Sequence, residues 1–423
     1  MLNRTTPPSF QIIDTIDILP MQTKKLKNGV LIHSLSVGEQ EIIKFEIVFL
    51  AGTNYETHKG VAAATAKMLL AGTEKYNAHQ IDEYFDELGA YYDISTDLKH
   101  ITLSIFVLRK YFKNILSFLN EILQNCNFPI EEWQINQKKT IQSLLVNLEK
   151  TNFIARQHFR EKLFGIEHIF GKTTQVEDIE KIKNEDLIQY FKDNIDKKPF
   201  EIFLTGKFDN NEIEIVENIF GERKIEPQSK VSGWKTPILQ EKKEFYLDIA
   251  DKVQTSFCIG QILFNQKHED YIPLRILTTI FGGYFGSRLM KNIREDKGYT
   301  YGISAALVPV MDAGYYVILA DVKKEFYQNV LTEIHKEAKI LQTELVSLTE
   351  LATVRNYLLG KFADGINTSF ELADLFKNVY FADLDYNYYH QYIKKIQTIT
   401  PEELLLLAQK YLKTDTMTCI GIG

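Results

Sequence analysis

The chain repeats itself, and this repetition constrains its fold more than any single motif does. Three landmarks recur in the same order, at distances of 209, 214 and 215 residues: GAYYDIS at 89–95 with GYTYGIS at 298–304, Lys181-Ile182 with Lys395-Ile396, and Gly206 at the end of FEIFLTG with Gly421 in MTCIGIG. Loop insertions account for the small drift in distance. The sequence therefore predicts two homologous halves that share one fold.

Within the first half, extended apolar runs are followed by helical ones. Residues 42–52 and 100–108 have the alternating or continuous apolar character of strands. Residues 61–72 are rich in helix formers, and residues 111–125 carry apolar side chains at helical spacing. This order predicts an α+β fold class, in which each half is a mostly antiparallel sheet backed by helices.

A polar stretch that contains Pro227, Gly233 and Pro237 has weak hydrophobic periodicity, which predicts a linker. We expect an N-terminal arm at 1–24, a first α+β half at 25–221, the linker at 222–243 and a second α+β half at 244–423. The 423 residues are enough to bury a sizeable core without disulfides or metal.

Charge and cysteine content narrow the class of protein. A net charge of -7 argues against a nucleic-acid partner, because such proteins carry a clustered basic face. The three cysteines, Cys126, Cys258 and Cys419, form no CxxC pair, which indicates free thiols in a reducing compartment. The sequence shows neither a secretory signal nor an apolar stretch of about 18 residues, so we expect a cytoplasmic protein with no membrane partner.

The sequence contains no motif for independent catalysis. No two of its nine histidines lie three to five residues apart, so neither HExxH nor HxxEH can be written. A zinc site needs three or four well-placed nitrogen, sulfur or oxygen donors. There is also no GxSxG elbow, no P-loop and no GxGxxG that opens a helix. The glycine-rich residues 282–286 predict a tight turn into a helix from Ser287.

A resemblance to a known family rests on the residues that surround the helical run at 61–72. These are Ala51-Gly52-Thr53-Asn54-Tyr55-Glu56, then Gly60-Val61-Ala62, then Met68-Leu69-Leu70-Ala71-Gly72-Thr73. The pattern resembles the opening of the inverted-motif zinc peptidases, which include pitrilysin, insulin-degrading enzyme and the mitochondrial processing peptidase. Active members place HxxEH on this helix. The resemblance covers nearly the whole chain and implies half of a clamshell.

The same resemblance implies that the metal positions have been emptied. The two histidine positions match Ala63 and Lys67, and the position of the glutamate base matches Ala66. The third ligand, a glutamate on a later helix, matches Ser143, with Gln142 as the neighbouring register. Alanine offers no lone pair and an ammonium group repels a cation, so we expect no metal and no catalytic residue here. A compatible alternative is that the helix packs as an Ala-rich core, with Lys67 solvated.

The second half keeps a different family signature. Arg294 and Tyr301, seven residues apart, resemble the pair that in the family reaches the zinc centre of another domain or subunit. If a helix ends near Arg294 and a strand starts near Tyr301, Gly298 turns the chain and brings both donors to one side. They could then hold a peptide carbonyl or an oxyanion. The alternative is a surface arginine paired with Glu295 or Asp296, with the tyrosine packed under the sheet.

The resemblance implies a function in a pair of chains. We expect the non-catalytic, substrate-binding subunit of a heterodimeric zinc metallopeptidase, inactive as a peptidase on its own. It would have no cofactor, since zinc belongs to a homologous HxxEH-bearing partner. The substrate would be an unfolded peptide, added as a strand at a sheet edge near the partner's equivalent of residues 45–50.

Other interpretations stay open. An inert structural subunit, like the core proteins of respiratory complexes, would need no Arg/Tyr pair. A chamber could also bind peptides without cutting them, and the isolated chain could form a homodimer.

Overall fold

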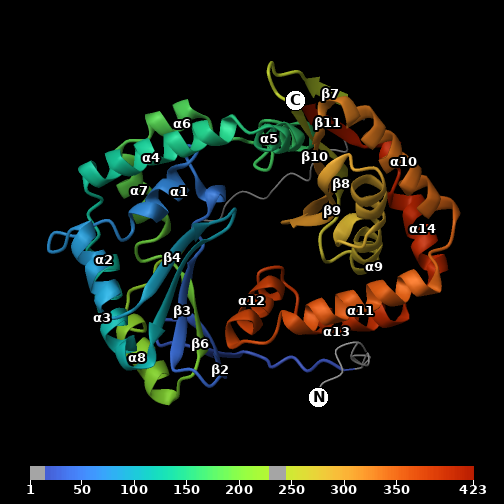
Figure 1. Ribbon diagram of the computed structural model, residues 1–423. Coiled ribbons are helices and arrows are strands. Elements are labelled where there is room, and N and C mark those ends of the chain that lie inside the picture. The colour runs from blue at the N-terminus through green and yellow to red at the C-terminus, as the bar shows by residue number, and fades with distance from the viewer. Residues whose placement is uncertain (1–14, 228–243) are drawn as a thin grey trace, which may run out of the picture. The chain divides into compact units, whose positions relative to one another are not determined.

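The computed structural model describes residues 15–227 and 244–423 (Figure 1). The chain divides into two compact units. The first unit has the described residues 20–227 and 368–374, and the second has 15–19, 244–367 and 375–423. Residues 1–14 of the predicted arm and 228–243 of the predicted linker lie outside the described residues. The first strand, Gln22–Lys25, begins inside the segment predicted as the arm.

The first unit contains a six-stranded sheet in the order β1-β2-β6-β3-β5-β4. Only β2 and β6 run parallel, and every other neighbouring pair is antiparallel. The strands are β1 Gln22–Lys25, β2 Leu31–Ser36, β3 Ile42–Phe49, β4 Tyr91–Thr96, β5 Ile101–Leu108 and β6 Phe200–Gly206.

The helical segments of the first unit are α1 Val61–Met68, α2 Ala78–Glu87, α3 Phe112–Asn125, α4 Ile130–Leu148, α5 Thr151–Phe164, α6 Val176–Lys181, α7 Asn184–Asn194 and α8 Asn210–Phe220, with the short turns η1 Thr53–Tyr55 and η2 Arg109–Tyr111. Helices cover one face of the sheet, while α5 extends away from it beyond α4, as the ribbon of this unit shows (Figure 1). Alternate residues of β3, including Phe45 and Phe49, join a continuous apolar core with helical residues such as Phe112 and Phe220.

The second unit contains a five-stranded sheet in the order β7-β11-β8-β10-β9. Only β7 and β11 run parallel. The strands are β7 Glu244–Leu247, β8 Gln254–Leu263, β9 Thr300–Val310, β10 Ala313–Lys323 and β11 Thr418–Ile422.

The sheet of the second unit has its own apolar core, which includes Phe257, Phe281 and Ile318. The helical segments of this part of the chain are α9 Tyr271–Thr278, η3 Thr279–Gly283, η4 Met290–Asp296, η5 Lys324–Phe326, α10 Tyr327–Thr343, α11 Leu348–Asp364, α12 Ser369–Tyr380, α13 Asn387–Thr398, α14 Pro401–Tyr411 and η6 Thr414–Thr416. Of these, η3 and η4 are π-helical.

The two sheets match strand for strand. The run β2-β6-β3-β5-β4 of the first sheet has the same order and directions as β7-β11-β8-β10-β9 of the second, and among the strands of residues 15–227 and 244–423 only β1 lacks a counterpart. The predicted α+β fold with two homologous halves is therefore confirmed. The repeated sequence landmarks agree with this correspondence between the sheets, since the GAYYDIS and GYTYGIS stretches lead into the matching strands β4 and β9.

One local expectation differs from the structure, and a second concerns the partner chain. The helix predicted over 61–72 ends at Met68, and Leu69 and Leu70 form a turn. The sheet edge expected near the partner's equivalent of residues 45–50 stays a prediction about the partner; in this chain those residues belong to β3 and the end of that strand, and β3 lies between β6 and β5. The edge strands are β1 and β4 in the first sheet, and β7 and β9 in the second.

Candidate functional site

Helix α1 carries the positions at which the resemblance implies lost metal ligands. The Glu56 carboxylate accepts hydrogen bonds from the backbone N–H groups of Gly60 and Ala62, at 3.1 and 3.0 Å. A carboxylate at this end complements the free amides and the dipole of the helix. Burial nevertheless raises the pKa of Glu56 to about 7, against the lowering effect of the two amides and of Lys172. The sequence thus starts α1 with a partly buried acid.

The side chains of α1 cannot hold zinc. Ala63 is half-buried and Ala66 is buried in the core, so both contribute only methyl groups. Lys67 is exposed, and its ammonium group donates to Thr140 Oγ1 of α4 at 3.1 Å. A cation site needs lone pairs from nitrogen, sulfur or oxygen, and these three residues supply none. The residues present therefore do not fit a zinc ion.

The third ligand position requires a shift of register. Ser143 and its neighbour Gln142 are both exposed. The α4 side chains that face α1 are instead Thr140, which binds Lys67, and Leu144, which lines a cavity together with Ala63. None of these four α4 residues is a carboxylate, so the correction does not restore a donor.

Arg294 and Tyr301 flank a sharp turn in the second unit. Arg294 lies in η4, Gly298 has a left-handed φ of +65°, and Tyr301 is the second residue of β9. Glycine adopts this φ at little cost, unlike most residues. The predicted sequence of helix, turn and strand is confirmed.

Both side chains are available to a ligand. Tyr301 is 91% exposed, so it is not packed under the sheet. The guanidinium carbon of Arg294 lies 4.6 Å from the ring centroid of Phe285, which is itself 63% exposed. In the described part of the chain, Arg294 forms no ion pair with Glu295 or Asp296. The structure thus shows neither an arginine paired with its acidic neighbours nor a tyrosine packed under the sheet.

Polar contacts hold the segment before this turn. Asn292 donates to Glu333 at 3.0 Å and to Glu337 at 2.6 Å, and both acceptors belong to α10. Arg288 donates two hydrogen bonds to the Glu350 carboxylate of α11, at 2.9 and 2.8 Å. Paired donation of this kind fixes orientation as well as distance. The backbone that carries Arg294 is therefore tied to two helices.

Three residues that lie near α1 in the structure, Glu56, Arg160 and Lys172, had no role predicted from the sequence. Glu56 lies four residues before Gly60, the N-cap of α1, where no standard capping pattern expects an acid. Arg160 and Lys172 line the same cavity as Ala63 but lie far from it along the chain, so no spacing pattern indicates them.

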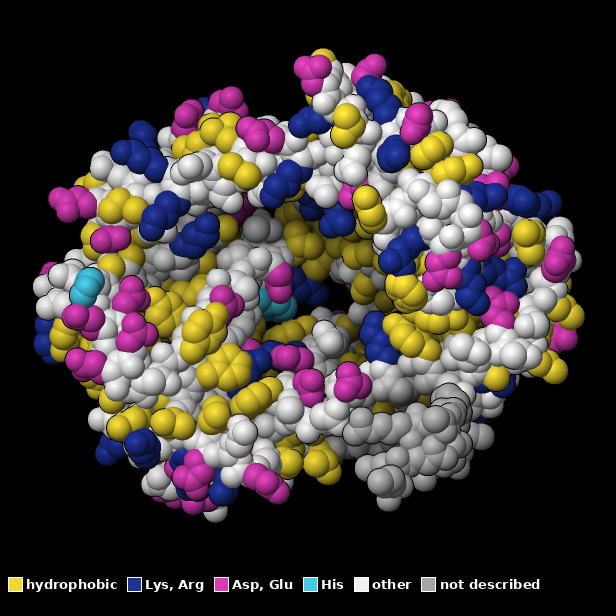
Figure 2. All heavy atoms as spheres, viewed as in Figure 1, with side chains coloured by type: hydrophobic (Ala, Val, Ile, Leu, Met, Phe, Trp, Pro, Cys, Tyr) yellow, Lys and Arg dark blue, Asp and Glu magenta, His cyan; other side chains and the backbone are white. Residues whose placement is uncertain are grey.

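Two wider observations concern the described residues as a whole. Among residues 15–227 and 244–423, no group of three or more His, Cys, Asp or Glu side chains is arranged to hold a metal. No helix within those ranges combines the length and apolar character needed to span a membrane. On the face drawn in Figure 2, basic and acidic side chains are interspersed.

The fold and the site define a class: proteins built like the two-part zinc peptidases, with a metal-site helix that lacks its donors. Comparison of the sequence with known families agrees. The family model described as "Insulinase (Peptidase family M16)" matches residues 35–173, and the one described as "Peptidase M16 inactive domain" matches residues 181–358. The chain belongs to peptidase family M16, as a member of the inactive type.

Individual relatives are distant but cover most of the chain. An uncharacterized zinc protease of Rickettsia bellii is 23% identical over 344 residues, which are 79% of this chain and 81% of its own. The non-peptidase homolog YmxG of Helicobacter pylori is 20% identical over 353 residues, 82% of this chain and 80% of its own.

Solved structures share the fold. A peptidase M16 inactive domain from Pseudomonas fluorescens superposes with a TM-score of 0.86 at 20% identity, covering 96% of this chain and 98% of its own. A chain of Complex III2 from Candida albicans gives a TM-score of 0.74 at 14% identity, with 95% of both chains covered.

Proposed function

We propose that the chain is the non-catalytic, substrate-binding subunit of a heterodimeric zinc peptidase whose partner carries HxxEH and the zinc ion. One observation carries this proposal. The half-buried Arg294 and the exposed Tyr301 flank a turn tied to the fold, while the metal positions Ala63, Ala66 and Lys67 offer no donors. A chain that keeps only this half of the family's chemistry needs a second chain for the other half.

The two retained side chains suit a peptide bond. A guanidinium group has five N–H donors in a fixed plane, and a phenol adds an O–H donor. Together they can orient a scissile carbonyl and stabilise the negative charge that develops on its oxygen. Phe285 limits the motion of Arg294 by stacking against it.

The substrate class follows from the free strand edge. Tyr301 lies on β9, which is an edge strand of its sheet. An extended peptide can add to such an edge through main-chain hydrogen bonds, which need no particular sequence. Unfolded peptides, rather than folded proteins, meet this requirement.

The test combines the purified chain with an HxxEH-bearing M16 protein that co-purifies with it from the native cell. We expect no peptide cleavage by the chain alone, and chelator-sensitive cleavage by the pair. Arg294→Ala and Tyr301→Phe should each lower kcat/KM of the pair by roughly 100-fold, the loss typical of one oxyanion donor. Lys291→Ala, which removes an exposed cation from the same segment, should leave the rate unchanged. Full activity in both site variants would refute the assigned role.

A second candidate is an inert structural subunit, favoured by the fold shared with a chain of Complex III2. In that case the chain would co-purify in an assembly whose peptidase activity is absent with every partner tested. Arg294→Ala would then change neither assembly nor any rate.

A further inference from the structure

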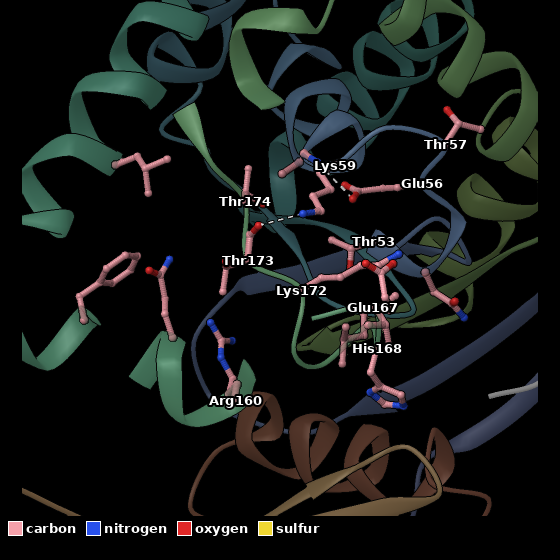
Figure 3. A pocket seen from close by; sticks show the side chains of 18 residues that line it. Thr53, Glu56, Thr57, Lys59, Arg160, Glu167, His168, Lys172, Thr173 and Thr174 are labelled. Carbon is pink, nitrogen blue, oxygen red and sulfur yellow. Dashed lines mark hydrogen bonds between the residues drawn. The ribbon is translucent and has the colours of Figure 1, made fainter. Parts of the chain in front are cut away.

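The first unit contains a cavity of about 700 Å³ beside the emptied metal positions (Figure 3). Ala63 of α1 and Leu144 of α4 form part of its wall. Its other sides come from the loop before α1, from α5 and from the loop at 167–174. A volume of this size lies within the range of sites that bind small ligands.

Its walls mix apolar and charged groups. The apolar lining includes Leu98, Phe153 and Ile169 as well as Leu144. Three cations, Lys59, Arg160 and Lys172, and two acids, Glu56 and Glu167, complete the charged lining, and Figure 3 shows them around the cavity.

Several of these charged groups are already engaged. Glu56 accepts two backbone N–H groups of the α1 start. Lys59 donates to the Thr173 carbonyl at 3.3 Å and lies 3.8 Å from an Asp178 oxygen. Arg160 and Lys172, by contrast, form no ion pair within the described ranges, although both line the cavity. Arg160 and Glu167 are thus the charged groups of the described lining without such a contact, and Lys172, which acts on Glu56 only through its charge, adds a second cation.

The wall that carries Lys172 is held by internal contacts. Thr173 is buried and donates to Glu161 Oε1 of α5 at 2.9 Å. His168 stacks on Phe164 with ring centroids 5.6 Å apart. The cavity is therefore shaped before any ligand arrives, which lowers the ordering cost of binding.

From these observations we infer that the cavity binds a carboxylate group of a peptide, with Arg160 and Lys172 as its cationic contacts and Leu98, Leu144 and Phe153 beside the adjoining apolar atoms. A guanidinium group pairs with a carboxylate through two parallel hydrogen bonds. A doubly charged phosphate fits less well, because repulsion by Glu167 grows with the charge of the ligand. The carboxylate comes from the C-terminus of a peptide or from an Asp or Glu side chain.

The experiment measures binding to the full chain alone, so its result is independent of the Arg294 and Tyr301 assays. The probe is a fluorescein-labelled, unstructured hexapeptide in four forms: with a free or amidated C-terminus, and with one central Glu or Gln. We expect the form with both carboxylates to bind best, and loss of the recognised carboxylate to weaken binding roughly tenfold. Which replacement weakens binding identifies the source of the carboxylate.

Variants test the assigned residues. Arg160→Ala and Lys172→Ala should each weaken binding of the best peptide roughly tenfold and leave the peptide without that carboxylate unaffected. Arg156→Ala is the matched control, an exposed arginine one turn earlier on α5 that does not line the cavity. Ala63→Leu should weaken binding by narrowing the cavity without changing its charge. Thermal melting checks that each variant folds.

Three results would overturn the inference. One is equal binding of all four peptides. Another is an Arg160→Ala variant that binds like Arg156→Ala. The third is displacement of the peptide by inorganic phosphate at lower concentration than by acetate.

Discussion

The two units share one strand order and differ in the chemistry that they keep. In the first unit, α1 presents methyl groups and an ammonium group where the family's active members carry ligands. In the second, η4 and β9 present an arginine and an exposed tyrosine. Five strands of each sheet match in order and direction. The difference therefore lies in a few side chains and not in the backbone.

The comparison shows which parts of such a fold can change freely. Core positions of both sheets need apolar side chains of suitable volume, because a buried cavity or clash costs several kcal/mol. A metal ligand has no such packing role once the ion is gone. Alanine at positions 63 and 66 keeps the helix and its packing while removing the chemistry.

The largest effect should come from restoring the missing donors. We expect the variant with Ala63→His, Ala66→Glu, Lys67→His and Leu144→Glu to bind zinc roughly a thousandfold more tightly than the wild type, since every ligand is supplied. Zinc retained after dialysis, measured by atomic absorption, checks this. The same variant with Ser143→Glu in place of Leu144→Glu is the control, and it should bind at least about tenfold more weakly because Ser143 is exposed. Equal zinc binding would contradict the register derived from α4.

The next prediction compares two glycines at matching places in the two sheets, Gly206 at the end of β6 and Gly421 near the end of β11. Gly206 has a φ of +121°, and a Cβ there would lie 2.1 Å from the Ile42 carbonyl oxygen. At Gly421 the nearest atoms belong to tyrosine side chains, Tyr246 and Tyr327, at 2.7 Å. We expect Gly206→Ala to lower the free energy of unfolding by about 3 kcal/mol and Gly421→Ala by about 1–2 kcal/mol, because rings can shift more easily than backbone. Urea unfolding followed by circular dichroism measures both, and the reverse order would show that the two sheet ends are packed differently.

A third prediction uses pH. The folded chain keeps a proton on Glu56 up to about pH 7, whereas the unfolded chain releases it near the ordinary value of 4.5. Because the folded state binds more protons in this window, the free energy of unfolding should fall as pH rises through it, by at most about 3 kcal/mol. Glu56→Gln should remove that part of the slope, measured by urea unfolding at pH 4.5, 6 and 8. Glu167→Gln, which removes an acid from the same cavity, should keep it. A wild-type slope equal to that of Glu56→Gln would contradict the burial of the acid.

Much of this architecture could be predicted from the sequence. Repeated landmarks such as Gly206 and Gly421 identified the duplication, and the apolar run at 200–206 coincides with β6. The turn at Gly298 was also predictable, because its spacing from Arg294 and Tyr301 is local. These features depend on neighbours in the chain, which periodicity and turn chemistry report directly.

The remainder depends on contacts between distant segments. Whether Ser143 or Leu144 faces α1 is decided by how two helices pack, and a shift of one residue turns a helix by about 100°. The position of β3 inside the sheet depends on its pairing with β6, more than 150 residues later in the chain. Arg160 and Lys172 meet Ala63 only in the folded unit. Local sequence patterns contain no information on contacts between residues so far apart in the chain.

The smallest effect concerns Lys67, which occupies a ligand position without a ligand's role. Its side chain is exposed and donates a hydrogen bond to Thr140 Oγ1 at 3.1 Å. We expect Lys67→Ala to change the free energy of unfolding by no more than about 0.5 kcal/mol, as exposed substitutions generally do. Thr140→Val, which removes the acceptor, should give the same small change in urea unfolding. A loss above about 1.5 kcal/mol in both variants would mean that this pair has replaced the metal as the link between α1 and α4. The first unit would then have exchanged one stabilising contact for another, while the second kept its original residues.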